Sequence, residues 1–358
     1  ILHNEFSDQI ATYGRLEADN FICCVPKQVI DAGYWKDLLD ISFSISGSTY
    51  HFYSCCGLYQ IEDRTLPINK MVDMARLAMN SIKNNYMKPY AWYDGSMLDT
   101  MIEEQRLVSD FRTAIMQKQF TVYFQPICRA DDGLVVSAEA LVRWNRDGDV
   151  VMPNIFVPLL EKYELITELD TYVLESICKL QQNWEKKGYK IFPISVNESR
   201  LHLYNKNHIN DLIDFVNKYG IKPNTIELEM TETSVVNNVE LAKEAERNVH
   251  KLGFTVSMDD FGTGYSSFSM LKNINIDVLK MDKSFFDDIV ESSRGKIIIE
   301  AIIEMSHKLG IEVVAEGIEN KEQVDYLKRI NCDMIQGYYF EKPISIEKFE
   351  EKYKNVFK

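Results

Sequence analysis

Oxygen-bearing side chains recur at the ends of strand-like segments in the C-terminal two-thirds of the chain. Glu139 lies in one such segment, Asn197 and Glu229 end the next two, and Asp259 and Asp260 end a fourth. Carboxylate and amide oxygens, without cysteine or histidine, favour Mg²⁺ or Mn²⁺ over zinc. Cations would also relieve the repulsion among so many converging carboxylates. The sequence therefore predicts a site for hard divalent metal ions.

Three more polar residues, Lys280, Glu316 and Gln336, occupy comparable places in the later strand-like segments. Adjacent aspartates such as Asp259 and Asp260 can flank a pair of metals roughly 3.5–4 Å apart, an arrangement used for in-line displacement at phosphorus. A lysine among them would position or polarise a water, or stabilise charge on the phosphate. These residues predict chemistry on a phosphate ester and leave the identity of the ester open.

Each of these residues has an ordinary structural explanation when it is taken alone. An acidic residue at a strand end is usually a helix cap or a solvated loop residue, and a lysine there is usually on the surface. Asp259-Asp260 before Phe261-Gly262 could be only a turn. One functional group in each successive strand unit is the observation that favours a shared site.

The elements that must position these residues alternate between strand and helix patterns. Eight strand candidates, mostly separated by helices, predict an α/β fold of the modified (β/α)₈ TIM-barrel type, with a doubly wound open sheet as the alternative. The first two strands are joined by a turn at Ala130–Gly133, so the first strand is expected to be antiparallel. The predicted strands are Phe120–Cys128, Leu134–Arg143, Lys190–Asn197, Thr225–Met230, Thr255–Asp260, Val278–Asp282, Glu312–Glu316 and Met334–Tyr338.

Two helices are predicted with particular clarity. Apolar residues recur on one face of Val239–Leu252, and Lys296–Leu309 is dense in isoleucine, as a helix packed on a sheet would be. Glycine is a common helix stop signal. The glycines that follow predicted helices, each just before a strand, are Gly188, Gly220, Gly253 and Gly310.

The first hundred residues differ in composition, with more Cys, Tyr and Met. Short strands are predicted at Phe21–Val25, Ile41–Ile45 and Tyr50–Leu58, followed by a helix at Ile68–Asn84. A helix at Asp99–Lys118 is expected to join the two parts of the chain. We place the boundary near Gly95 and expect a small α+β part-domain before it.

Composition limits the classes of protein and partner. The 358 residues carry a net charge of −14 and the pI is about 5.0, which argues against a nucleic-acid polymer or an anionic membrane surface as the partner. Seven cysteines without a CxxC motif predict reduced thiols in a cytoplasmic protein. The chain begins at Ile1 without a methionine, so we expect a longer protein whose missing part could hold a sensor or a membrane segment.

The same residues resemble the EAL domain, the cyclic di-GMP phosphodiesterase family. The resemblance covers about Asp110 to Lys358 and is specific, because the motifs occur in order and with plausible spacing. The matching motifs are Gln125-Pro126-Ile127, Glu139-Ala140-Leu141-Val142-Arg143-Trp144, Ser195-Val196-Asn197, Glu229-Met230-Thr231-Glu232, Asp259-Asp260-Phe261-Gly262-Thr263-Gly264-Tyr265-Ser266-Ser267, Lys280-Met281-Asp282, Ala315-Glu316-Gly317 and Gln336-Gly337-Tyr338.

This resemblance implies an enzyme that hydrolyses cyclic di-GMP to linear 5′-pGpG through in-line attack of a metal-activated water. It implies two Mg²⁺ or Mn²⁺ ions per site and inhibition by Ca²⁺. Glu139, Asn197, Glu229 and Asp259 are expected to hold the first metal, and Asp259 and Asp260 the second. Lys280 is expected to contact the attacking water, and Glu316 and Gln336 to order the water network or the substrate.

The remaining roles are also implied by the resemblance. Glu232 is expected to steady the loop Asp260–Ser267, and Asp282 to support Lys280. Substrate contacts are expected at Gln125, Leu141, Arg143, Asp260 and Gln336. A homodimer through the barrel, near the loop after Asp260, is expected from the family alone. Two alternatives stay open: a module that binds cyclic di-GMP without cleaving it, and a scaffold whose barrel serves dimer contacts.

The N-terminal part resembles the C-terminal portion of a GGDEF domain, the diguanylate cyclase family, in a degenerate form. Arg15-Leu16-Glu17-Ala18-Asp19-Asn20-Phe21 aligns with the signature loop, but Glu17 and Ala18 replace its two glycines and Asn20 removes a carboxylate. Side chains there obstruct a tight turn and the approach of a nucleotide base. Cyclase activity is therefore not expected, and the part would be regulatory or structural. The expected domains are residues 1–95 for this part, 96–110 for a linker helix and 111–358 for the barrel.

Overall fold

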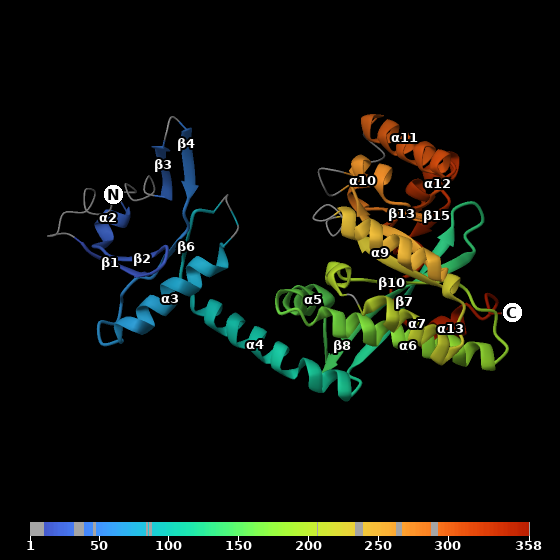
Figure 1. The fold of residues 1–358 in the computed structure, drawn as a ribbon, viewed down its shortest axis with the longest axis horizontal. Helices are drawn as coiled ribbons and strands as arrows, with labels where there is room; N and C mark the ends of the chain where they lie inside the picture. Colours follow the sequence, from blue (N-terminus) through green and yellow to red (C-terminus); the bar gives the residue numbers. More distant parts are fainter. Residues whose placement is uncertain are drawn as a thin grey trace. The chain divides into compact units, whose positions relative to one another are not determined.

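The computed structural model divides into two compact units, Ile1–Leu107 and Val108–Lys358, and the division falls within helix α4 (Gly95–Met116). Each unit is shown in Figure 1 and is treated separately below. The structure describes residues 11–31, 39–45, 48–83, 85, 88–205, 207–232, 239–262, 267–287 and 293–357.

The second unit contains a closed eight-stranded barrel. Strand β7 pairs with both β8 and β15, which closes the ring, and it runs antiparallel to each of them. The other neighbours in the ring are parallel, so the modified barrel is confirmed and the open sheet is wrong. The ring strands are β7 (Phe120–Arg129), β8 (Val135–Arg146), β10 (Ile194–Asn197), β11 (Ile226–Thr231), β12 (Thr255–Phe261), β13 (Val278–Met281), β14 (Glu312–Ala315) and β15 (Met334–Gln336).

The antiparallel first strand follows from the length of its connection. Gly133 donates its N–H to the carbonyl of Arg129 at 2.9 Å and has a φ of +73°, which glycine adopts without strain. So short a turn cannot cross over the sheet, and it forces β8 to return alongside β7 in the opposite direction.

Helices cover the outside of the barrel. Helix α9 has the predicted bounds, whereas α11 begins three residues earlier than predicted. The four stop glycines all have positive φ, which confirms their role at the helix ends. The helices are α5 (Pro153–Lys162), α6 (Ile166–Lys186), α7 (His208–Tyr219), α9 (Val239–Leu252), α10 (Ser267–Asn273), α11 (Ser293–Leu309), α12 (Lys321–Arg329) and α13 (Ile346–Lys352), with 3-10 turns η2 (Arg200–Tyr204), η3 (Pro223–Thr225) and η4 (Lys283–Phe285) and edge strands β9 (Asp149–Val151) and β16 (Ile344–Ser345).

Four predicted strands are too long. Val278–Asp282 and Glu312–Glu316 exceed the observed strands by one residue each, and the other two by more. The segment predicted from Lys190 enters the sheet only at Ile194, because Pro193 has no N–H to donate and Lys190 donates to the carbonyl of Phe357 instead. The last strand ends at Gln336 rather than Tyr338. A Cβ on Gly337 would lie 2.1 Å from the carbonyl oxygen of Ile318, so the chain turns there against another backbone segment.

The base of the barrel, opposite the carboxyl ends of its parallel strands, carries two equivalent His–Asp clamps. The tetrapeptide His-Lys-Leu-Gly closes both α9 and α11. Asp277, just before β13, accepts through Oδ2 from the Val256 N–H and pairs with His250 Nε2, both at 2.8 Å. In the second clamp, the Oδ2 atom of Asp333, just before β15, accepts from the N–H of Val313 at 2.8 Å and lies 2.9 Å from Nε2 of His307. Each clamp therefore ties a helix end to two adjacent strands.

The first unit is built from short strands and one long helix. A hairpin of β1 (Thr12–Glu17) and β2 (Asn20–Cys24) precedes α2 (Lys27–Asp31) and a second hairpin of β3 (Asp40–Ile45) and β4 (Ser48–Tyr53). Strands β5 (Cys56–Leu58) and β6 (Tyr90–Trp92) are parallel and pack on α3 (Ile68–Ser81).

Several predictions for this unit need correction. The predicted strand Tyr50–Leu58 is wrong as one piece, because the chain leaves the hairpin at Ser54, whose N–H donates to the Leu39 carbonyl. Strand β2 ends one residue before the predicted Val25, and β1 was not predicted. The predicted helix ends at Ser81, and its last residue, Asn84, lies outside the described residues. Gly57 explains the close packing of β5, since a Cβ there would lie 1.8 Å from the Ala75 carbonyl oxygen on α3.

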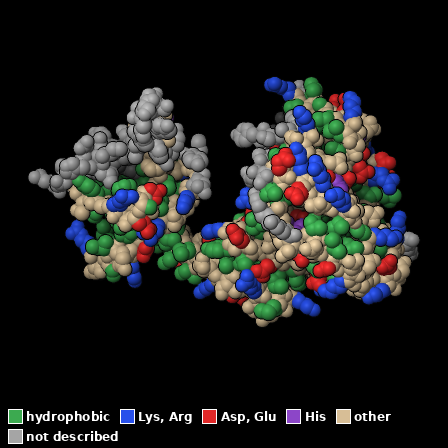
Figure 2. All heavy atoms as spheres, in the orientation of Figure 1, with side chains coloured by type: hydrophobic (Ala, Val, Ile, Leu, Met, Phe, Trp, Pro, Cys, Tyr) green, Lys and Arg blue, Asp and Glu red, His purple; other side chains and the backbone are tan. Residues whose placement is uncertain are grey.

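The surface and helix lengths give two further observations. On the face drawn in Figure 2, basic and acidic side chains are interspersed over the barrel unit, so this face does not present charge of a single sign. Among the helices that the structure describes, none combines the length and the apolar composition needed to cross a membrane.

Candidate active site

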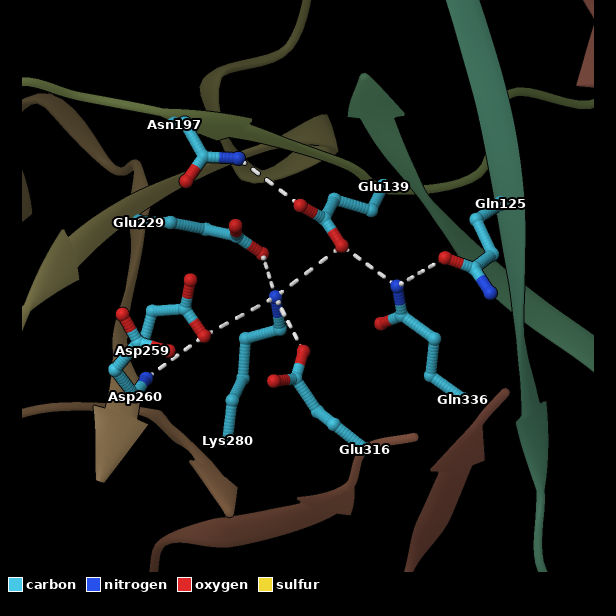
Figure 3. Close-up of polar contacts among 9 residues, drawn as sticks. All are labelled: Gln125, Glu139, Asn197, Glu229, Asp259, Asp260, Lys280, Glu316 and Gln336. Carbon is cyan, nitrogen blue, oxygen red and sulfur yellow. Dashed lines mark hydrogen bonds and ion pairs between the residues drawn. The ribbon is translucent and has the colours of Figure 1, made fainter. Parts of the chain in front are cut away.

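Side chains from all eight barrel strands, or from the residues that directly follow them, converge at the carboxyl end of the parallel strands (Figure 3). In such a barrel this end is where reactive groups gather, because all parallel strands finish there. Strand β7 runs in the opposite direction and contributes Gln125, which lies directly opposite Glu139 of β8. The residues that meet are Gln125, Glu139, Asn197, Glu229, Asp259, Asp260, Lys280, Glu316 and Gln336.

Lys280 lies at the centre of the cluster with no exposed surface. Its Nζ atom is 2.8 Å from Glu316 Oε1 and 2.9 Å from Glu229 Oε1. Glu139 Oε2 and Asp259 Oδ1 lie slightly farther away, at 3.4 and 3.6 Å. Burial would lower the pKa of this ammonium, but attraction from the four carboxylates raises it well above the ordinary lysine value. The group is therefore a fixed positive charge.

Acidic groups outnumber that charge, since Glu139, Glu229, Asp259, Asp260 and Glu316 surround one ammonium. Burial raises the pKa of Glu229 well above its usual value, and the neighbouring carboxylates add to this while Lys280 opposes it. Burial likewise raises the pKa of Glu316 to about 8. Asp260 has a raised pKa as well, from burial and from the charge of Asp259. The site is short of positive charge.

Glu139 is the hub of the hydrogen bonds. Its Oε1 accepts from the Asn197 amide at 3.0 Å, and its Oε2 accepts from Gln336 Nε2 at 2.6 Å. Gln336 Nε2 also lies 3.2 Å from Gln125 Oε1, and Gln125 donates through Nε2 to the Glu341 carbonyl at 3.3 Å. This chain of contacts fixes the orientation of the Glu139 carboxylate.

Asp259 and Asp260 are placed by an irregularity at the end of β12. The pairing of β12 with β13 shifts register between Met258 and Phe261. Asp260 takes a φ of +56°, unusual for a residue with a side chain, and its N–H donates to Asp259 Oδ1 at 2.9 Å. Such an irregularity re-aims side chains at a sheet end, so that both carboxylates can serve one mouth.

The donor set fits a divalent cation by its chemistry. Glu229 Oε1 meets the Lys280 ammonium, but its Oε2 is buried without a hydrogen-bond or ion-pair partner, although buried polar atoms are normally satisfied. The acid excess adds a demand for positive charge. As the side chains stand, Lys280 takes the central position, and within the described ranges no three His, Cys, Asp or Glu side chains are arranged to hold a metal ion.

Two predicted supporting residues lie at the rim. Glu232 is fully buried and its Oε2 accepts from the Gly262 N–H at 2.9 Å, at the start of the loop it was predicted to steady. The next loop residues, 263–266, lie outside the described residues. Asp282 caps η4 by accepting from the Ser284 N–H at 2.9 Å. Its predicted support of Lys280 stays a prediction.

The two remaining predicted contacts follow Glu139 along β8. Leu141 and Arg143 stand two and four residues on, so they share its face of the strand. The Arg143 guanidinium lies 5.5 Å from the centre of the Tyr123 ring and donates to the Val142 carbonyl at 2.8 Å. Burial lowers its pKa, against attraction from Tyr123, Tyr338 and Glu139. These groups form a partly buried wall beside the cluster.

A polar layer beneath the cluster was not predicted from the sequence. Glu227, two residues before Glu229 on β11, is buried, and its Oε1 atom has no hydrogen-bond partner. The Ser195 hydroxyl is also buried without a hydrogen-bond partner, and the Ser257 hydroxyl interacts with the Glu227 carboxyl. The alternation of Glu227 and Glu229 was the available signal, because residues two apart on a strand face the same side.

Comparisons with known proteins agree with this geometry. A family model described as EAL domain matches residues 108–343. The signaling protein YkoW of Bacillus subtilis is 34% identical over 285 residues, covering 79% of this chain and 35% of that protein. The bifunctional diguanylate cyclase/cyclic di-GMP phosphodiesterase MucR of Pseudomonas aeruginosa is 29% identical over 344 residues, covering 94% of this chain and 50% of MucR. The chain thus spans half the length or less of these relatives.

Solved structures are similar as well. The PaMucR phosphodiesterase in complex with c-di-GMP superposes with a TM-score of 0.64 at 29% identity, covering 68% of this chain and 99% of the other. A crystal structure of an EAL domain protein from Listeria monocytogenes EGD-e gives a TM-score of 0.62 at 31% identity, covering 70% and 98%.

Proposed function

The chain belongs to the EAL domain family, and on that premise we propose that it hydrolyses cyclic di-GMP to linear 5′-pGpG. The observation that carries the proposal is the convergence of eight other predicted site residues around the buried Lys280. Relatives support the substrate, because MucR and NbdA of Pseudomonas aeruginosa are named cyclic di-GMP phosphodiesterases. The related PaMucR structure is a complex with that nucleotide.

Divalent metal ions, Mg²⁺ or Mn²⁺, are part of the proposal. Phosphodiesterases of this family are metal-dependent in general. Glu139, Asn197, Glu229 and Asp259 would hold one ion, and Asp259 with Asp260 a second. The ions would supply Lewis-acid activation of water and charge neutralisation at phosphorus. The acid excess and the unpartnered Oε2 atom of Glu229 support this assignment.

The chain's own groups supply orientation and charge. Lys280 keeps a positive charge in a buried place, where it would contact the attacking water and stabilise the phosphate oxygens as negative charge develops. Gln336 and Gln125 hold Glu139 and present amides to the substrate, and Glu316 holds Lys280. Arg143 and Leu141 would line the substrate beside them. The burial of these groups strengthens every electrostatic contact.

The first unit is proposed to be the C-terminal part of a degenerate GGDEF domain with a regulatory or structural role. Its signature-like segment forms the β1–β2 hairpin, and Ala18 in the turn has a φ of +42°. Glycine would adopt that conformation without strain, and the Ala18 side chain narrows the approach to the turn. This geometry supports the absence of cyclase activity.

Two further proposals rest on the family alone. Ca²⁺ would inhibit, because it prefers longer and looser oxygen coordination than Mg²⁺. The protein would form a homodimer through the barrel near the loop after Asp260. Sedimentation of the purified chain tests the dimer, and a Ca²⁺ titration of the Mg²⁺-supported reaction tests the inhibition.

The central experiment incubates the protein with cyclic di-GMP and Mg²⁺, with and without EDTA, and follows pGpG by chromatography. We expect metal-dependent product that is lost in Glu139→Gln and retained in Glu240→Gln, a control on the exposed start of α9. Binding of cyclic di-GMP without turnover under either Mg²⁺ or Mn²⁺ would instead identify a receptor. No binding at all would favour the scaffold alternative.

A further inference from the structure

A second buried cluster of charged groups lies directly behind the end of β10. It consists of Asp170 on α6, Glu198 after the strand, His202 in η2 and His208 at the start of α7. The side chains of all four are at most 13% exposed. None of them belongs to the predicted site. Acidic side chains are almost never buried unless they are paired.

The four groups form two acid–base pairs in contact. His202 Nε2 lies 3.1 Å from Asp170 Oδ2, and His208 Nε2 lies 3.0 Å from Glu198 Oε1. The centres of the two imidazole rings lie 4.1 Å apart, and the ring planes are tilted by 39°. Each carboxylate therefore has one histidine as its partner, and removal of one partner leaves a buried polar group unsatisfied.

The cluster is attached to the backbone that carries Asn197. Asp170 Oδ2 also accepts from the Ser199 N–H at 3.0 Å. The Glu198 N–H donates to the Glu229 carbonyl at 2.9 Å, and Asn197 pairs in register with Glu229 across β10 and β11. The residues just after Asn197 are thus held on one side by the cluster and on the other by the strand that bears Glu229.

The same geometry argues against a ligand site here. Every Nε2 atom is already engaged by a carboxylate, and in the described chain no such group is arranged for a metal ion. The adjoining cavity, between the cluster and Leu228, Met230 and Val256, has a volume of about 20 Å³. That is room for about one water molecule and not for a substrate.

We propose that Asp170, Glu198, His202 and His208 form a hydrogen-bonded positioning quartet that fixes the turn after β10 and thereby aims Asn197 into the metal site. The inference rests on the proposed function for its metal, but not for the hold on the backbone. Groups that orient metal ligands typically change metal affinity by roughly 10–100-fold when they are altered. The quartet is expected to act within that range.

The test uses His202→Gln, Asp170→Asn and the double variant. His202→Gln leaves the buried Asp170 carboxylate without its histidine partner. The double variant replaces the pair with two neutral amides of similar shape. Mn²⁺ affinity is measured by electron paramagnetic resonance on the full chain. We expect affinity about 10-fold or more weaker in His202→Gln, a smaller loss in Asp170→Asn, and recovery to within about threefold in the double variant. His307→Gln, which alters a His–Asp pair at the base, is the matched control and should leave Mn²⁺ affinity unchanged.

A second readout needs no metal. Hydrogen exchange followed by mass spectrometry should show faster exchange across residues 197–202 in His202→Gln than in the wild type, with recovery in the double variant. Unchanged exchange and unchanged Mn²⁺ affinity in a folded His202→Gln would overturn the quartet, as would failure of the double variant to recover either one. If the single variant does not fold, Asp170→Asn and the double variant decide in the same way. A wild type that binds no Mn²⁺ defeats the proposed metal site and the aiming of Asn197 into it, while the exchange comparison still decides the hold on the turn.

Discussion

The two ends of the barrel treat polar groups in opposite ways. At the base, the Asp277 and Asp333 carboxylates each satisfy one histidine and one strand N–H through a single Oδ2 atom. At the mouth, four carboxylates share one ammonium, Asp260 adds a fifth acid beside them, and Glu229 Oε2 has no partner. A satisfied base can hold strands in register, whereas a mouth short of positive charge favours the cations that we propose it binds. Stability and function are therefore assigned to opposite ends, as in other barrels.

The largest expected effect comes from removing the positive charge at the mouth. Lys280→Met should lower kcat/KM for cyclic di-GMP by about 10³-fold, because no other group replaces the buried ammonium near phosphorus. Steady-state assays at saturating Mg²⁺ measure this. Lys308→Met, at an exposed lysine on α11, is the control and should stay within about twofold.

A Lys280→Met enzyme with more than a tenth of wild-type kcat/KM would break the comparison at its functional end. The lysine would then be a counter-ion for the metal-free protein only. Circular dichroism of both variants must show that they are folded before the rates are compared.

The next effect concerns the base. Asp333→Ala removes the acceptor of Val313 and His307, and should cost about 1–3 kcal/mol of unfolding free energy. Urea denaturation measures the loss. The activity of the folded fraction should stay within about threefold of wild type. Asp333→Asn keeps an acceptor oxygen and should cost less, and a large fall in kcat without a loss of stability would contradict the division between the ends.

A smaller effect of opposite sign is expected for Glu229→Gln. Charge on this carboxylate is disfavoured by burial and by its acidic neighbours, so its removal should stabilise the metal-free protein by about 1 kcal/mol. The same substitution should abolish Mn²⁺ binding. Thermal unfolding in EDTA, compared with Glu240→Gln, tests the stability. A destabilised variant would show that Glu229 serves mainly as the partner of Lys280.

The smallest expected effect is a pH dependence of the thermal stability that His250 contributes at the base. Burial lowers the pKa of His250, but its contacts with Asp277 and Glu246 outweigh this and raise it above 6.5. Because the folded pKa is the higher one, the stabilisation is complete below about pH 6.5 and is lost as pH rises through the folded value. The difference in Tm between wild type and His250→Gln should therefore shrink from pH 6 to pH 9. A difference that grows over this range would exclude a charged His250 clamp.

Much of the mouth could be predicted from the sequence because its residues stand in strands with a clear period. Carboxylates at strand ends converge once the strands are parallel, so Glu139, Asn197, Glu229 and Asp259 could be grouped without coordinates. The short turn at Ala130–Gly133 likewise predicted the reversed first strand. These inferences needed only local patterns and one topological rule.

What could not be predicted depends on contacts between distant segments. The pairing of Asp170 with His202 joins a helix to a 3-10 turn, and neither residue belongs to a recognisable pattern. The early end of the last strand comes from the approach of Gly337 to Ile318. The central position of Lys280 was also not predicted, because a strand pattern gives the side on which a residue lies and not how far its side chain reaches.

The duplicated clamp has a consequence for how such a barrel can change. Lys280 and Gln336 each stand three residues after a clamp aspartate. A cation and an amide therefore occupy equivalent positions on two strands that are anchored by the same kind of clamp. Substitution at either position leaves the clamp at the base of that strand intact. The side chains at the mouth can therefore be changed one strand at a time, by evolution or by design, while the contacts at the base stay the same.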